Sequence, residues 1–186
     1  MATWYTVGVL YVALLRGINV GGKNMIRMAD LKASFEAGGF ADVSTYIASG
    51  NVLFRAPRSS SSSLSRRIEE MLTKAFGYRT SIVLRSHRQM HEVVDGAPAD
   101  FGSPECRSDV FFLKEPLRAA TVIGAVPIRE GVDELHPGKG VVYFSRVASR
   151  ATQSRISRIA SLPLYKSITI RSWSTTEKLL RLMDEL

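Results

Sequence analysis

A glycine-rich segment with basic residues offers the clearest chemistry in this sequence. The segment contains three glycines, two basic residues and two asparagines: Arg16, Gly17, Asn19, Gly21, Gly22, Lys23 and Asn24. Glycine permits backbone conformations in which N–H groups converge on an anion, and the basic side chains would neutralise its charge. We therefore predict that this segment binds a phosphate or a similar anionic group. The alternative is an ordinary connection from a strand to a helix, with solvated basic side chains.

The same segment matches a nucleotide-binding P-loop only in part. Its pattern is G-x-x-x-x-G-K, but Asn24 stands where a P-loop has the Ser or Thr that binds Mg²⁺. A P-loop helix begins at the lysine, whereas here the next helix is expected to begin near Ala29. No predicted strand ends in the aspartate that would hold the metal. Nucleotide hydrolysis by a P-loop mechanism is therefore not expected.

The three histidines and the single cysteine give little support for a metal or a nucleophile. His87 and His91 lie four residues apart on a predicted helix, so both could face one metal ion. The sequence indicates no third ligand, and a solvated helix face explains the pair. Cys106 cannot form an internal disulfide or a thiolate zinc site alone. The sequence thus predicts no metal and no cofactor.

A long basic stretch is the second candidate site. Residues 135–176 contain no Asp or Glu, and the basic residues there are Lys139, Arg146, Arg150, Arg155, Arg158, Lys166 and Arg171. On a helix expected over 151–161, the arginines would face outward while the isoleucines face the core. Four arginines are candidates for contact with a nucleic-acid backbone: Arg150, Arg155, Arg158 and Arg171. The alternative is a solvated basic face.

The elements that would position these residues follow the same order twice. In the first half, strands are expected over 7–15, 43–47, 52–55 and 81–85, with helices over 29–37 and 64–76 and a flexible serine loop over 59–63. In the second half, strands are expected over 110–113, 132–135, 141–144 and 168–171, with helices over 118–125, 151–161 and 175–186. The β-α-β-β-α-β order is ferredoxin-like.

Local similarity between the halves indicates an internal duplication. Residues 81–86 (SIVLRS) match residues 167–172 (SITIRS), 86 positions later, and a helix is expected after each. We predict an α+β protein of two tandem ferredoxin-like units, each with an extra C-terminal helix, packed as one compact body. The expected division is 1–97, a linker over 98–107, and 108–186.

This fold would bring a third feature next to the glycine-rich segment. Ser49 and Asn51 belong to a turn whose hairpin would lie beside the first strand. Small acylphosphatases share the ferredoxin-like fold and use an arginine with an asparagine, so Arg16 or Arg27 with Asn51 could imitate that pair. The alternative is an asparagine that adopts a turn conformation.

The composition is that of an ordinary globular protein with a basic surface. Of the 186 residues, 45% are hydrophobic and 23% are charged, and the formal net charge is +8. A basic surface attracts anions. The apolar run over 7–15 lacks the flanks of a signal peptide and is too short to span a bilayer as a helix. A cytoplasmic protein without membrane contact is expected, and its single cysteine fits a reducing compartment.

Three segments together resemble a known bacterial family. Residues 14–24 (LLRGINVGGKN) and 49–54 (SGNVLF) are similar to signatures of the family called domain of unknown function 1697. The C-terminal pattern of that family fits Thr169, Arg171, Trp173, Thr175, Lys178 and Leu179. Ser172 and Ser174 replace two asparagines of the pattern. The resemblance implies two ferredoxin-like units, and it brings no activity, cofactor or catalytic residue.

Several functions stay open on this basis. Binding of a phosphate-bearing ligand or a nucleic acid agrees best with the glycine-rich segment and the basic second half. A small hydrolase of acyl or phosphoryl esters is the alternative enzyme. A protein-interaction module without catalysis is the third hypothesis.

Overall fold

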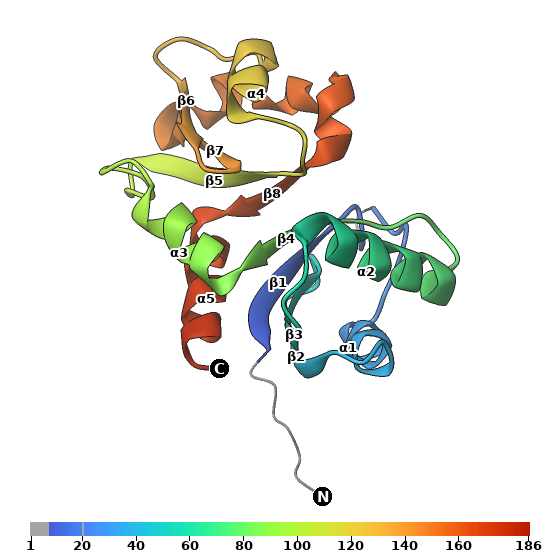
Figure 1. Ribbon diagram of the computed structural model, residues 1–186. Helices are drawn as coiled ribbons and strands as arrows, with labels where there is room; N and C mark the ends of the chain where they lie inside the picture. The colour runs from blue at the N-terminus through green and yellow to red at the C-terminus, as the bar shows by residue number, and fades with distance from the viewer. Residues whose placement is uncertain (1–7, 20) are drawn as a thin grey trace, which may run out of the picture. The chain divides into compact units, whose positions relative to one another are not determined.

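The computed structural model describes residues 8–19 and 21–186, and they form two compact units (Figure 1). Val7, in the first predicted strand, and Val20, in the glycine-rich segment, lie outside the described residues. Unit 1 comprises Met1–Gln89 with Leu182–Leu186, and unit 2 comprises Met90–Arg181. Each unit is described by itself.

Unit 1 has the ferredoxin-like order. Its elements are β1 (Val9–Arg16), α1 (Met28–Ala37), β2 (Ala41–Tyr46), β3 (Asn51–Ala56), α2 (Ser61–Phe76) and β4 (Ser81–Ser86), followed by the start of α3 (His87–Asp95). The four strands form one antiparallel sheet in the order β2-β3-β1-β4. Figure 1 shows α1 and α2 on the same side of this sheet.

The core of unit 1 lies between the sheet and these two helices. Alternate residues of β1 and β3, among them Ala13 and Phe54, face Leu31 and Phe35 of α1 and Ile68 of α2. The intervening residues of β1 are buried as well, since all residues from Leu10 to Leu15 are at most 7% exposed. Burial of both faces explains why β1 is an unbroken apolar run.

Unit 2 repeats this arrangement. Its elements are β5 (Cys106–Leu113), α4 (Ala119–Ala125), β6 (Asp133–Gly138), β7 (Val141–Val147), three 3₁₀ helices (Ala148–Gln153, Ile156–Ser161 and Pro163–Ser167), β8 (Ile168–Ser172) and α5 (Trp173–Asp184). The sheet order is β6-β7-β5-β8, with all pairs antiparallel. Its core joins Phe111 and Phe144 of the sheet to Val122 of α4 and to Ile159.

Equivalent registers confirm the predicted duplication. Arg85 of β4 pairs with Val12, and Arg171 of β8 pairs with Val110, so the 86-residue offset holds in the sheets. Both arginines donate from Nη1 to the carbonyl oxygen of the preceding residue, at 2.8 and 2.9 Å. An additional helix, α3 or α5, follows the last strand of each unit. The α+β fold is therefore two ferredoxin-like units in tandem.

The serine run is part of a helix rather than the flexible loop that was predicted. The α2 helix begins at Ser61, and the Ser60 hydroxyl accepts a hydrogen bond from the Ser63 N–H at 3.3 Å. Serine is a favoured helix-capping residue because its hydroxyl satisfies an N–H group of the first turn. The serine run that was predicted to be a flexible loop therefore forms the first turn of α2.

The α-helix predicted over 151–161 is not formed, because two successive 3₁₀ helices occupy this segment. The Asp133 carboxylate accepts the Arg155 N–H at 2.9 Å, which removes a donor from an α-helical ladder. Ser154 accepts the Ile156 N–H at 3.2 Å and competes in the same way.

The segment predicted as a linker, 98–107, belongs to unit 2. Phe101 packs edge-on against Tyr143 and Trp173, with ring centroids 5.3 and 5.0 Å apart, and Cys106 already begins β5. The two units instead divide within α3 and α5. A continuous helix gives no change in composition at such a division. Across the described ranges, no helix has the length and apolar character needed to cross a membrane.

Candidate functional site

The glycine-rich segment follows β1 directly and lies at one end of unit 1. Gly17, Gly21 and Gly22 have φ angles of 69°, 59° and 74°, in the left-handed region that favours glycine. All three are exposed, and a Cβ added to any of them would meet no described atom within 4 Å. The segment therefore presents open backbone to solvent.

Asn19 holds the segment in shape. Its side-chain amide donates to the carbonyl oxygens of Ile26 and Ala48, at 3.0 and 2.8 Å, and its Oδ1 accepts the Ile26 N–H at 2.7 Å. Its φ of 53° is left-handed, a conformation that asparagine tolerates better than most residues. These bonds give Asn19 a positioning role, and its predicted contact with a ligand stays a prediction.

The same bonds bring the two N-terminal motifs together, as the sequence predicted. Ala48 lies in the turn before Gly50, and the Leu15 N–H donates to the Gly50 carbonyl at 2.8 Å. A Cβ on Gly50 would lie 2.5 Å from Ile18 Cδ1, so only glycine fits between the two segments. Ile18, at 2% exposure, anchors the glycine-rich segment beneath this turn.

The far end of the segment is fixed by Asn24. Its side-chain amide donates to the Gly17 carbonyl at 3.1 Å, and its own carbonyl accepts the Asn19 N–H at 3.1 Å. Tyr78 Oη approaches the Asn24 carbonyl at 3.4 Å. The α1 helix then starts at Met28, five residues after Lys23, so the segment lacks the helix of a P-loop.

The glycine-rich segment carries two basic side chains, Arg16 and Lys23. Arg16 is half-buried at the end of β1, and Lys23 is exposed on the loop. Arg27 is committed to Asp30, with its Nε and Nη2 atoms 2.7 and 3.0 Å from the two carboxylate oxygens. This bidentate pair raises the pKa of Arg27 by its hydrogen bond and its charge.

A hollow of about 580 Å³ lies along α2 and the start of β4. It is lined by Arg66, Glu69, Glu70, Thr73, Lys74, Arg79 and Thr80. Tyr78 contacts Asn24, and Arg16 pairs with Ser81 across the sheet, so Arg79 lies near the glycine-rich segment. Sequence reasoning missed Arg79, because only the pairing of β1 with β4 brings it to this end.

Asn51 and Ser49 act within their own hairpin. Asn51 is fully buried, and its amide donates to the Tyr46 carbonyl at 2.8 Å and to Ser49 Oγ at 3.2 Å. An amide nitrogen carries only two hydrogens, so these bonds use its donors. With Arg27 also paired to Asp30, the arrangement does not favour the hydrolase hypothesis.

The basic residues of the second candidate site divide into two groups. Arg150 and Arg158 are exposed on 3₁₀ helices, and Arg155 is exposed between them. Arg150 Nη2 donates to the Gly131 carbonyl at 2.6 Å. Arg171 is only 8% exposed, and burial lowers its pKa to about 10. Arg171 is thus still charged at neutral pH, but its burial separates it from the exposed arginines.

The C-terminal motif starts α5. Ser172 Oγ accepts the Thr175 N–H at 3.3 Å, so Ser172 caps the helix. Trp173 packs on Phe101, and a Cβ on Gly102 would lie 2.2 Å from its ring. Asparagine caps helices about as well as serine, so either residue at position 172 could satisfy the Thr175 N–H.

These features define a class of protein: a duplicated ferredoxin-like α+β chain whose glycine-rich segment is held against its first hairpin. The chain belongs to the family described as protein of unknown function DUF1697, which matches residues 10–143. Among solved structures, it is similar to the conserved bacterial protein SP0830 from Streptococcus pneumoniae. The TM-score is 0.82 and the identity 27%, over 94% of this chain and 98% of that chain. The comparison with curated proteins gives no match.

Proposed function

We propose that the protein binds a small anionic ligand on residues 16–24. Among anionic ligands, one that carries a phosphate group agrees best with this segment. One observation carries the proposal: Gly21 and Gly22 combine left-handed φ angles with exposure to solvent. Within the described part of the chain, no acceptor is paired with their N–H groups. Exposed N–H groups on a loop of fixed shape form an anion site at little entropic cost.

The surrounding charges support the same ligand class. Arg16 and Lys23 flank the glycines, and Arg79 lies at the same end of the unit. The net charge of +8 gives the molecule a basic surface that attracts anions. We place this activity in the cytoplasm of a bacterium, where phosphorylated metabolites are abundant and the single thiol of Cys106 stays reduced.

The decisive experiment compares two glycine-to-valine variants, one inside the proposed site and one at an exposed glycine of the other unit. Gly22→Val adds a side chain to the proposed site, while Gly131→Val makes the same change at an exposed glycine of unit 2 with φ of 70° and open space. Binding of inorganic phosphate, pyrophosphate and ATP is followed by amide chemical shifts. We expect Gly22→Val to weaken binding by about tenfold or more, and Gly131→Val to leave it unchanged.

Lys23→Ala distinguishes backbone recognition from simple charge attraction. An exposed charge contributes up to about 1 kcal/mol, so this variant is expected to weaken binding about fivefold, less than Gly22→Val. Absence of amide shifts at Gly21 and Gly22 with all three probes would contradict the proposal. Equal weakening by the two valine variants would contradict it as well.

A second candidate function is nucleic-acid binding through unit 2. Arg155 and Arg158 are exposed, and among the described residues no carboxylate pairs with either guanidinium. Arg150 lies just before them in the chain. Arginines that are not neutralised by nearby carboxylates are available for phosphate contacts.

A further inference from the structure

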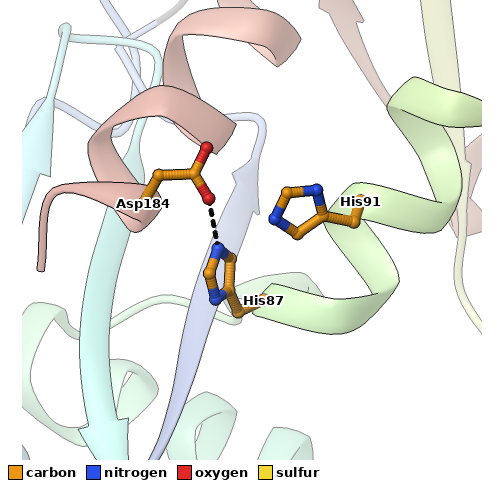
Figure 2. Close-up of side chains that lie close together, drawn as sticks. All are labelled: His87, His91 and Asp184. Atoms are coloured by element: carbon orange, nitrogen blue, oxygen red, sulfur yellow. Dashed lines mark hydrogen bonds and ion pairs between the residues drawn. The ribbon is translucent and has the colours of Figure 1, made fainter.

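The geometry points to a binding site for a divalent transition-metal ion, such as Zn²⁺, on His87, His91 and Asp184. His87 Nε2 lies 2.6 Å from Asp184 Oδ1. Each of the three residues offers one possible ligand atom, and these three atoms lie within 4.8 Å of one another. Figure 2 shows His87 bonded to Asp184 and the His91 ring turned toward the same space.

Helix geometry fixes the two histidines. His87 is the first residue of α3, and His91 follows four positions later on the same continuous helix. Residues four apart on a helix lie on the same face, with Cβ atoms about 5–6 Å apart. Two imidazoles at this spacing are a common pair of ligands for one metal ion.

The start of α3 has a fixed position because it is capped on both sides. Ser86 Oγ accepts the Gln89 N–H at 3.3 Å, and Gln89 Oε1 accepts the Ser86 N–H at 2.8 Å. This reciprocal arrangement is a capping box. It holds His87 at a defined point beside the end of the sheet.

Asp184 supplies the third ligand. It is the last residue of α5, and within unit 1 the chain end is held by Arg55, whose Nη2 donates to the Leu186 carbonyl at 2.8 Å. The C-terminal end of a helix carries a partial negative charge that favours a cation. Asp184 is 97 residues from His87, so no local spacing in the sequence indicated it.

The distances suit coordination after small side-chain movements. Zn²⁺ binds imidazole nitrogen and carboxylate oxygen at about 2.0–2.2 Å, so neighbouring ligand atoms lie about 3–4 Å apart. The side chains of His87 and Asp184 are 36% and 45% exposed, so a small rotation of each would bring the two ligand atoms to this separation. Exposure also leaves room for water in the fourth position.

The donor set decides the class of metal. Imidazole suits zinc, copper, nickel and iron, whereas Mg²⁺ and Ca²⁺ prefer all-oxygen ligands. Two histidines and one carboxylate with an open position form the ligand set of several hydrolytic zinc sites. We infer a zinc-type site that retains an exchangeable water molecule.

The test uses the full-length protein without a histidine tag. Zn²⁺ binding is measured by calorimetry, and Co²⁺ binding by its visible absorption. We expect one ion per chain, and a loss of affinity of about tenfold or more in His91→Ala and in Asp184→Asn, since even removal of an outer partner of a ligand typically costs that much. Asp184→Asn preserves the size of the side chain, so it also separates ligand loss from misfolding.

His136→Ala is the matched control. His136 is the remaining histidine of the three in the chain, is exposed, and lies 3.4 Å from Glu134 in unit 2. Its removal is expected to leave the affinity unchanged. The inference is overturned if the native protein takes up neither ion at micromolar concentration, or if His91→Ala and Asp184→Asn bind like the native protein. An equal loss in His136→Ala would overturn it as well.

Discussion

At the scale of single residues, three polar side chains, Asn19, Asn51 and Asp133, hold the backbone in place. Asn19 bonds three backbone groups, and Asn51 uses its amide inside one hairpin. Asp133 does the same in unit 2, where its Oδ2 accepts the N–H groups of Arg129 and Arg155, both at 2.9 Å. Such residues attract attention in a sequence because their types could also serve catalysis.

Asp133 gives a stability prediction with a defined pH dependence. Burial acts to raise its pKa, but hydrogen bonds from Ser154, Arg155 and Arg129 and the charge of Arg146 outweigh burial, so the pKa lies below its ordinary value. We expect Asp133→Asn to reduce the free energy of unfolding at pH 7 by about 1–3 kcal/mol. Urea denaturation measures the difference.

The sign of the pH effect follows from the depressed pKa. The stabilisation by Asp133 is fully present above the unfolded-state pKa of about 3.9, and it is lost as the pH falls through the lower folded-state value. The difference in the free energy of unfolding between the native protein and Asp133→Asn should therefore decrease below about pH 4. Glu130 is exposed and lies three residues before Asp133, so Glu130→Gln should have the same free energy of unfolding as the native protein at both pH values. A difference between the native protein and Asp133→Asn that increased in acid would contradict this account.

At the scale of elements, the same type of cap begins the additional helix of each unit. Ser86 precedes α3 and Ser172 precedes α5, 86 positions apart, and each hydroxyl accepts an N–H group three residues ahead. The duplication therefore preserved the strand, the cap and the helix together. In contrast, the segment before β8 lost the helix that α2 provides in unit 1.

The contribution of the Ser172 cap to stability can be tested by substitution. We expect Ser172→Ala to lower the free energy of unfolding by about 1 kcal/mol, because the Thr175 N–H loses its acceptor. Ser172→Asn should leave stability nearly unchanged, since asparagine caps equally well. Thermal and urea unfolding measure both variants, with Ser174→Ala as the control inside the first turn. The explanation fails if asparagine destabilises as much as alanine.

At the scale of the whole molecule, the charge distribution makes a prediction about nucleic acids. If the exposed arginines of unit 2 contact phosphates, binding of an oligonucleotide must weaken steeply with salt, because each contact releases counter-ions. Replacement of Arg150, Arg155 and Arg158 by alanine should reduce the slope of log K against log salt by about 2–3 for duplex DNA. Fluorescence anisotropy over a salt series measures the slope.

A control variant removes the same charge from the other unit. Lys32, Arg58 and Lys74 are exposed in unit 1, and their replacement by alanine should change the slope less than the unit 2 variant does. No binding of single-stranded or duplex oligonucleotides at low salt would remove nucleic acid as a ligand. An identical effect of both triple variants would show that only net charge matters.

The sequence by itself determined the fold, because the fold depends on local patterns. Apolar runs such as Leu10–Leu15, stripes such as Leu64, Ile68 and Leu72, and the repeated strand before α3 and α5 specify the elements and their duplication. Predictions were wrong where a distant contact overrode local preference. The α-helix expected over 151–161 is absent because Asp133, more than 20 residues away, takes the Arg155 N–H.

Only the tertiary structure decided which residues share a site. Ferredoxin-like pairing joins the glycine-rich segment to the turn at Gly50 and brings Arg79 to the same end, while burial removes Arg171 from the basic face. Asp184 joins His87 across 97 positions of sequence. Spacing along a chain predicts neighbours within one helix or strand, whereas the identity of a third ligand depends on how elements pack.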